Sequence, residues 1–110
     1  MEPLVTVLIS SYNQGAYISE CLNSVLNQSY KNLQVIVVDD GSQDDTLKIL
    51  QSCEDERLTA LTTEKNTAFR LYEIAEKEIQ GKYVAELASD DRWTLDKIKK
   101  QVDFLERKST

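Results

Sequence analysis

Residues 33–42 read Leu-Gln-Val-Ile-Val-Val-Asp-Asp-Gly-Ser, and this stretch decides how the chain must fold. The run over 33–38 is short, apolar and rich in β-branched side chains, which is typical of a buried strand. Asp39, Asp40 and Gly41 follow at once, so the strand ends in a turn that carries two carboxylates. The stretch therefore predicts a core strand with polar side chains at its carboxyl end.

The sequence before this strand predicts another strand and a helix. Residues 4–9, Leu-Val-Thr-Val-Leu-Ile, form a second apolar run, which the turn-forming residues 10–15 close. A helix reaching about Gln28 is expected next, because apolar residues recur there at the spacing of a single helical face. The residues of this face are Ile18, Cys21, Leu22, Val25 and Leu26.

The sequence after residue 42 continues the alternation of helix and strand. Asp44, Asp45 and Thr46 offer N-cap side chains for a second helix, and 58–62 is predicted to be a third strand. From about Thr67 the apolar residues again share a helical face, and Gly81 is expected to end that helix in the left-handed conformation. The apolar residues of this face are Ala68, Leu71, Ala75 and Ile79.

The last part of the chain predicts a fourth strand and a final helix. Residues 83–87, Tyr-Val-Ala-Glu-Leu, are predicted to form the fourth strand, which runs into Ala-Ser-Asp-Asp-Arg over 88–92. We expect Thr94 to cap the helix, and Trp93 to form a hydrophobic staple with Ile98 at its start. The predicted buried stripe consists of Leu95, Ile98, Val102 and Leu105.

The order of these elements is β-α-β-α-β-α-β-α with short connections. This order predicts an α/β fold: a mostly parallel, Rossmann-like sheet with helices packed on both faces. In such sheets ligands bind beyond the carboxyl ends of the strands, so functional residues are expected just after each strand.

The composition narrows the chemistry. Thirteen Lys and Arg against nineteen Asp and Glu give a net charge of −6 over 110 residues, which argues against a nucleic-acid partner. The chain has no His, so catalysis would depend on carboxylates, hydroxyls or a metal. Cys21 and Cys53 lack metal-ligand spacing and are interpreted as reduced core thiols. We find no membrane-spanning run and no secretory signal, so the expected compartment is the cytoplasm.

Polar clusters follow three of the four predicted strands. Residues 10–15, Ser-Ser-Tyr-Asn-Gln-Gly, could stack a planar ring and hydrogen-bond its edge, or form an ordinary polar turn. Asp39 and Asp40 could bind a cation or a ligand, with helix capping as the alternative. Asp90 and Asp91 add a second carboxylate pair at the same edge. Since carboxylates suit Mg²⁺ or Mn²⁺ bound to a substrate diphosphate, the constellation predicts a metal and a phosphate-bearing ligand with a flat base.

The motifs, in their order and spacing, resemble the signatures of family 2 glycosyltransferases. The matching segments are residues 5–13 (VTVLISSYN), 24–30 (SVLNQSY), 35–46 (VIVVDDGSQDDT), 81–84 (GKYV) and 90–93 (DDRW). The resemblance implies the N-terminal half of a GT-A fold, which binds a nucleotide-diphospho-sugar, here a UDP-sugar. The implied reaction transfers the sugar to an acceptor hydroxyl with inversion.

The resemblance also implies roles for the first polar cluster and its neighbours. Ser10 and Tyr12 match positions that contact the nucleotide base, with Tyr12 as the stacking ring, and Asn13 belongs to the same nucleotide-binding motif. Asp40 matches the carboxylate that hydrogen-bonds the base, and Asp39 is its neighbour in the motif.

The second carboxylate pair matches the end of the family's DXD-type metal motif. By this resemblance Asp90 contacts the ribose, and Asp91 holds a divalent metal, Mn²⁺ or Mg²⁺, on the diphosphate. Ala88 stands where many relatives carry the first Asp of the motif, so metal binding would depend on Asp91, assisted by Asp90. Residues 66–72 keep only the outline of the family pattern, and Arg70 is interpreted as a solvated charge.

The resemblance implies a larger enzyme of polysaccharide biosynthesis, acting in the cytoplasm or at the cytoplasmic membrane face. Its acceptor would be a saccharide or a lipid-linked sugar. The acceptor-binding half and the catalytic base are expected beyond Thr110. Residues 1–110 are therefore expected to bind the donor, to contain no catalytic residue and to transfer sugar slowly or not at all.

Two other functions stay open from the residues alone. A receiver-like signalling module also holds Mg²⁺ with an acidic pair, although residues 58–66 offer no Asp that could accept a phosphate. A purely structural fragment, in which the carboxylates are caps and solvated loops, would bind no nucleotide.

Overall fold

Four parallel strands form the centre of the protein. The computed structural model describes residues 2–63 and 71–108, and within them the sheet has the order β3-β2-β1-β4. The strands are β1 (Val5–Ser11), β2 (Leu33–Asp39), β3 (Leu58–Thr62) and β4 (Tyr83–Ala88). Each neighbouring pair is parallel, which confirms the predicted sheet.

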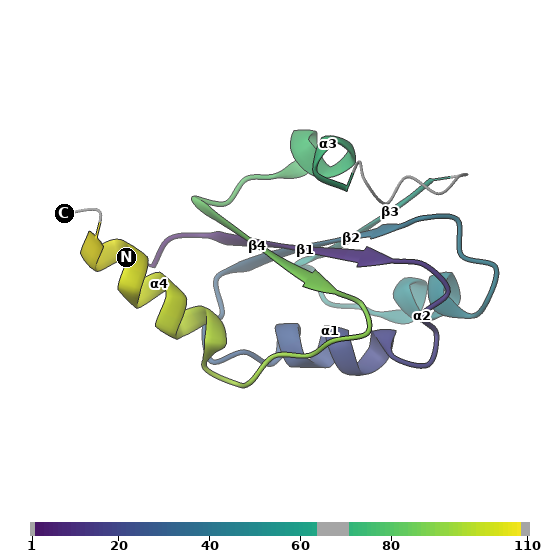
Figure 1. The fold of residues 1–110 in the computed structure, drawn as a ribbon, viewed down its shortest axis with the longest axis horizontal. Coiled ribbons are helices and arrows are strands. Elements are labelled where there is room, and N and C mark those ends of the chain that lie inside the picture. The colour runs from purple at the N-terminus through teal and green to yellow at the C-terminus, as the bar shows by residue number, and fades with distance from the viewer. Residues whose placement is uncertain (1, 64–70, 109–110) are drawn as a thin grey trace.

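Helices cover both faces of this sheet, as predicted (Figure 1). One face carries α1 (Ile18–Leu26), α2 (Thr46–Ser52) and α4 (Lys97–Lys108). The other face carries α3 (Leu71–Ala75), which the 3-10 turn η2 (Glu76–Glu78) extends. None of the helices in the described part of the chain is long and apolar enough to cross a membrane.

The larger core lies between the sheet and α1. Alternate residues of β1 face it, because side chains of a strand point to opposite faces in turn. The predicted apolar face of α1 is confirmed, since four of its five residues are buried and Leu26 packs against them. The strand and helix residues of this core include Val5, Val7, Ile9, Ile18, Cys21, Leu22, Val25, Val35 and Val37.

The smaller core lies under α3 on the opposite face. Leu8, Ile36 and Val38 pack there with Ala75, and Ile79 is half-buried against them. Ala75 therefore confirms the predicted apolar face of this helix, whereas Ile79 reaches the same core from extended backbone just after η2. Ala68 and the side chain of Leu71 lie outside the described part of the chain.

Gly81 has a different role from the one predicted. The helix ends before it, and the positive φ angles in the described residues belong to Asn13 and Gly41. A Cβ on Gly81 would lie 2.5 Å from the backbone nitrogen of Thr6 and 2.9 Å from the carbonyl oxygen of Tyr83. Gly81 is therefore needed for a close approach of two backbones, and the expectation of a left-handed helix end was wrong.

The predicted stripe of α4 is only half-buried. Ile98 and Val102 join the larger core, whereas Leu95 is 61% exposed and Leu105 is 39% exposed. Leu95 is exposed because α4 begins three residues after Thr94, which leaves Leu95 in the preceding turn.

The N-terminus of α4 is capped from a distant part of the chain. Oε1 of Gln28 accepts a hydrogen bond from the backbone amide of Ile98 at 3.0 Å, across 70 residues of sequence. Thr94 is not the N-cap, and Trp93 does not occupy the staple position before it, so both of these expectations were wrong. Trp93 instead packs half-buried against the larger core.

Candidate functional site

The carboxyl ends of β1, β2 and β4 are hydrogen-bonded to one another. The backbone amide of Asp40 donates to the carbonyl of Ser11 at 2.8 Å, and the amide of Ser89 donates to the carbonyl of Ser10 at 3.2 Å. These bonds continue the parallel register one residue beyond the strands. The polar residues that follow three strands therefore meet at one edge of the sheet, on the right of Figure 1.

Asp39 is fully buried at the end of β2. Its Oδ2 accepts the backbone amide of Ser42 at 3.0 Å, and its Oδ1 accepts the hydroxyl of Ser42 at 2.5 Å. Gly41 lies between Asp39 and Ser42 in the chain and has a φ of 78°, a left-handed conformation that residues with a side chain rarely adopt. The carboxylate of Asp39 therefore holds the turn after β2, which satisfies its buried charge.

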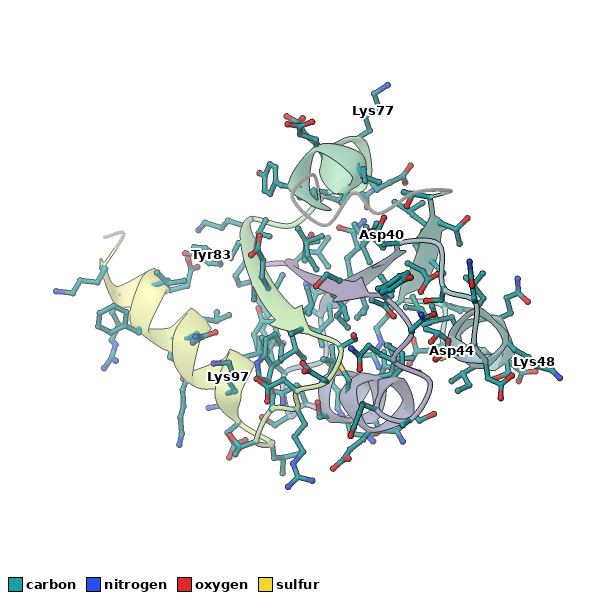
Figure 2. All side chains as sticks on the ribbon, turned by 45° about the vertical axis from the view of Figure 1, so that its right-hand side comes forward. Asp40, Asp44, Lys48, Lys77, Tyr83 and Lys97 are labelled. Atoms are coloured by element: carbon teal, nitrogen blue, oxygen red, sulfur yellow. The ribbon has the colours of Figure 1, made fainter. Side chains whose placement is uncertain are left out.

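Asp40 is also buried and lies beside the end of β3. Its side chain and backbone are 6% exposed, and Oδ1 accepts a hydrogen bond from the hydroxyl of Thr63 at 2.6 Å. Figure 2, in which the strand ends turn toward the viewer, shows Asp40 at this edge and Asp44 near the start of α2. Thr63 was not anticipated from the sequence, because only the pairing of β2 with β3 brings it to Asp40.

The loop after β1 is tied to the loop after β2. Asn13 has a φ of 50°. Its backbone amide donates a hydrogen bond to Ser42 Oγ at 2.8 Å, and its side-chain Oδ1 accepts one from the backbone amide of Gln43 at 2.8 Å. Asn tolerates this left-handed conformation better than most residues. The ring of Tyr12, in the same loop, is 47% exposed and so is accessible to a planar ligand.

Asp44 reinforces this junction of loops. Its carboxylate accepts the backbone amides of Thr46 at 2.9 Å and of Gly15 at 3.0 Å. Hydrogen bonds from the Thr46 hydroxyl and amide, and then from Gly15, hold the pKa of Asp44 below its usual value. Capping of α2 by Asp44 is thus confirmed, whereas Asp45 stands at the N-cap position without a side-chain cap bond.

Ser10 and Ser11 end β1 on opposite faces of the sheet. Ser10 is half-buried, and the buried Oγ of Ser11 makes no hydrogen bond within residues 2–63 and 71–108. Both hydroxyls lie at the strand end that the sequence singled out as a polar cluster.

Asp90 and Asp91 are exposed in the segment between β4 and α4. Asp91 Oδ1 accepts the amide of Arg92 at 2.8 Å, and Arg92 forms an ion pair with Glu20 of α1. The thiol of Cys21 on α1 donates to the carbonyl oxygen of Ala88 at 3.7 Å, at the end of β4 just before this segment. Burial, and then the charges of Asp91 and Asp90, raise the pKa of Cys21 to about 12.

The free thiols fit the sequence interpretation in part. Cys21 is buried in the core as expected, whereas Cys53 is half-buried at the C-terminal end of α2. Arg70, for which a solvated charge was expected, lies outside the described residues.

The donor set at this edge suits a hard divalent cation that is shared with a ligand. In the described residues no cluster of three or more His, Cys, Asp or Glu side chains forms a dedicated metal cage. Two adjacent, accessible carboxylates match the way Mg²⁺ is usually held, by one or two carboxylates, water and substrate phosphates. Asp90 and Asp91 therefore fit a metal that binds together with a diphosphate.

The class of protein follows from the fold. The chain superposes on the crystal structure of residues 1–349 of S. aureus TarS in complex with UDP-GlcNAc. The TM-score is 0.86 and the identity 30%, over 94% of this chain and 31% of that 1–349 chain. The mannosyltransferase PcManGT of Pyrobaculum calidifontis, solved with GDP-Man and Mn²⁺, gives a TM-score of 0.76 at 29% identity, over 84% of this chain and 29% of the other. The fold is that of the N-terminal region of GT-A glycosyltransferases.

The family follows from the sequence. Residues 6–110 match the family description "Glycosyl transferase family 2", and the chain belongs to this family. A Bacillus subtilis (strain 168) protein provisionally named teichuronic acid biosynthesis glycosyltransferase TuaG is 42% identical over 98% of this chain and 44% of its own length. The Escherichia coli UDP-Glc:alpha-D-GlcNAc-diphosphoundecaprenol beta-1,3-glucosyltransferase WfaP is 37% identical over 94% of this chain and 41% of its own length.

These findings confirm the resemblance inferred from the motifs and leave no support for a receiver-like module. The chain spans less than half the length of TuaG and WfaP. The roles of the individual site residues stay predictions.

Proposed function

We propose that residues 1–110 are the donor-binding portion of an inverting glycosyltransferase that uses a UDP-sugar. The observation that supports this proposal best is the hydrogen-bonded edge, where β1, β2 and β4 bring Ser10, Asp40 and Ser89 together. Membership of family 2 supports the reaction class. The UDP-GlcNAc complex of TarS, at 30% identity, supports UDP as the nucleotide.

The nucleoside is proposed to bind over the ends of β1 and β2. The exposed ring of Tyr12 would stack on the flat base, while Ser10 and Asp40 would hydrogen-bond its edge. Asp40 is well suited to this task because Thr63 already orients its buried carboxylate. Asn13 and Asp39 would contribute by holding the surrounding loops, since both bond to Ser42.

The ribose and the diphosphate are proposed to bind beside the segment after β4. Asp90 would contact the ribose, and Asp91 would hold Mn²⁺ or Mg²⁺. When bound, such a cation neutralises charge on the departing nucleoside diphosphate. In this chain the backbone amide of Arg92 orients the carboxylate of Asp91 by donating a hydrogen bond to its Oδ1.

The acceptor is proposed to be a saccharide or a lipid-linked sugar at the cytoplasmic membrane face. WfaP, a relative at 37% identity, is named for a diphosphoundecaprenol-linked substrate. The base that deprotonates the acceptor hydroxyl is proposed to lie outside residues 1–110, since the relatives TuaG and WfaP are more than twice as long as the part that this chain matches. Residues 1–110 would then bind the donor and transfer sugar slowly or not at all.

Calorimetric titration tests the donor site directly. UDP, GDP and ADP are titrated into the 110-residue chain with Mn²⁺ and with EDTA, and the series is repeated on Asp91→Asn. We expect a UDP signal that requires both Mn²⁺ and Asp91. Asp103→Asn is the matched control, because Asp103 is an exposed carboxylate on α4, and this variant should bind like the unchanged chain.

Other outcomes would change the proposal. No binding of any nucleotide would favour a structural fragment, whereas a stronger signal with GDP would overturn the choice of UDP. Sustained metal-dependent sugar transfer by residues 1–110 alone would show that the base lies within them.

A further inference from the structure

The second half of the segment that carries Asp90 and Asp91 is hydrogen-bonded to α1 and to the residues just after it. We refer to residues 89–96 as the acidic segment. The backbone amide of Trp93 donates to Ser24 Oγ at 3.1 Å. Ser29, just beyond α1, donates its amide to the carbonyl of Leu95 at 3.0 Å and its hydroxyl to Asp96 at 2.6 Å. The acidic segment therefore depends on α1 for its position, although it follows β4 in the chain.

Gln28 is at the centre of this attachment, and its side chain is fully buried. Its Nε2 donates to the carbonyl of Thr94 at 2.6 Å and to the carbonyl of Ser24 at 3.0 Å. Its Oε1 accepts the amide of Ile98 at 3.0 Å. Both hydrogens of the Gln28 side-chain amide are therefore hydrogen-bonded. Through these bonds the side chain of Gln28 joins α1, the acidic segment and the first turn of α4.

We propose that Gln28 is a positioning residue that sets where Asp91 stands in the donor site. This inference rests on the proposed function, because Asp91 is the metal ligand only if the site binds a nucleotide diphosphate. The acidic segment is anchored at its start, where the amide of Ser89 bonds to Ser10, and at its end, where Gln28 acts together with Ser24 and Ser29. Of these three residues, Gln28 is the one that is also bonded to the first turn of α4. Asp90 and Asp91 are exposed between these anchors, so the geometry of the metal ligand depends on both ends.

The chain provides a spectroscopic reporter of this attachment. Trp93 is the single tryptophan, and it is half-buried within the acidic segment. Lys97 Nζ lies 5.4 Å from the centre of its ring, at the start of α4, where Figure 2 labels Lys97. A movement of the acidic segment should therefore change the emission of Trp93 directly.

The chain also provides a matched control residue. Gln34 uses its side-chain amide in the same way, accepting the amide of Gln80 at 2.9 Å and donating to the carbonyl of Glu78. It lies on β2 and ties down the η2–β4 connection, away from the acidic segment. Gln28→Met and Gln34→Met each remove three side-chain hydrogen bonds, at a fully buried residue in the first case and at a half-buried residue that also accepts the Thr6 hydroxyl in the second. Only the first change should affect Asp91.

The experiment compares the two variants with the unchanged 110-residue chain by Trp93 emission, hydrogen exchange of the Ile98 and Trp93 amides, and calorimetric titration of UDP with Mn²⁺. In Gln28→Met we expect emission at longer wavelength, faster exchange of both amides and roughly tenfold weaker Mn²⁺-dependent binding, the size typical of residues that orient metal ligands. Gln34→Met should leave all three unchanged. If Gln28→Met does not fold, Ser24→Ala is used in its place. This change removes the acceptor of the Trp93 amide and the bond from the Ser24 hydroxyl to the Cys21 carbonyl, and it should produce the same changes to a smaller extent.

Unchanged emission and exchange in a folded Gln28→Met variant would overturn the positioning role. Equal weakening of UDP binding by Gln28→Met and Gln34→Met would also overturn it, because a general loss of stability would then explain both. If the unchanged chain binds no UDP, the proposed function fails, and emission and exchange alone decide whether Gln28 holds the acidic segment.

Discussion

The hydroxyl of Thr63 lies 2.6 Å from Oδ1 of Asp40 and donates a hydrogen bond to it. Thr63 follows the edge strand β3, and Asp40 follows the neighbouring strand β2. The bond therefore joins the ends of two strands at a buried carboxylate. It links the stability of the sheet edge to the orientation of the carboxylate proposed to read the base.

Replacing Thr63 with Val should lower both stability and donor binding. The change keeps the shape of the side chain but removes a hydrogen bond to a charged acceptor, which costs roughly 1.5–3 kcal/mol in the free energy of unfolding. Urea denaturation measures this loss, and calorimetry measures the weaker binding of UDP. Thr62→Val, at an exposed position of β3, is the control and should change neither quantity. A stable Thr63→Val variant with full UDP binding would contradict a role of this bond at the site.

Replacing Gly81 with Ala should destabilise the fold. The added Cβ would lie 2.5 Å from the backbone nitrogen of Thr6, so β1 or the start of β4 must shift, at a cost of about 1–3 kcal/mol. Thermal or urea denaturation provides the measurement. Gly15→Ala is the comparison, because its Cβ would first meet a side-chain oxygen of Asp44 at 3.1 Å and should be tolerated better. If both variants were equally stable, the close approach at Gly81 would not limit the fold.

The ion pair of Asp55 and Arg57 should make stability fall in acid. Hydrogen bonds from the Arg57 side chain and amide lower the pKa of Asp55 to about 2 from a model-compound value of 3.8. Because the folded pKa is the lower one, the contribution to stability is complete above about pH 5 and is lost as the pH falls toward 2. Partial exposure of both side chains reduces this contribution to about 1 kcal/mol.

The measurement is the free energy of unfolding by urea between pH 2 and 7, for the unchanged chain and for Asp55→Asn. We expect Asp55→Asn to be less stable at neutral pH and the two curves to converge near pH 2. Parallel curves over the whole range would show that the pair contributes no pH dependence.

The two thiols should differ in reactivity. Burial, with the charges of Asp91 and Asp90, raises the pKa of Cys21 to about 12, so the reactive thiolate is scarce even at pH 9. A disulfide reagent should label Cys53 first in the folded protein, and both thiols in urea. Cys53→Ser should abolish the fast reaction. Rapid labelling of Cys21 in folded Cys53→Ser would contradict its burial.

Local patterns in the sequence predicted the strands, the apolar face of α1 and the polar clusters after three strands. These features depend on neighbours within one element, since the alternation of a strand and the period of a helix decide which side chains face the core. The carboxylates of Asp40 and Asp91 were identified for the same reason, because Asp40 directly follows β2 and Asp91 lies three residues beyond the end of β4.

The misplaced features depend on residues that are far apart in the chain. Thr94 is a good capping residue, yet the first turn of α4 is capped by Gln28 from 70 positions away. Gly81 follows a helix and resembles a helix end, yet the backbone of Thr6 explains its small size. Neither partner can be found from local sequence, because the packing of β1 and α1 against β4 and α4 creates both contacts.

By itself, the sequence determined the alternation of strands and helices, the family and the edge of the sheet where polar residues gather. Tertiary structure decided which of those polar groups are already engaged: Asp39 with Ser42, Asn13 with Gln43, and Asp40 with Thr63. The physical reason is that periodicity and turn chemistry act over a few residues, whereas the partner of a buried polar group is set by strand register and by the packing of distant segments.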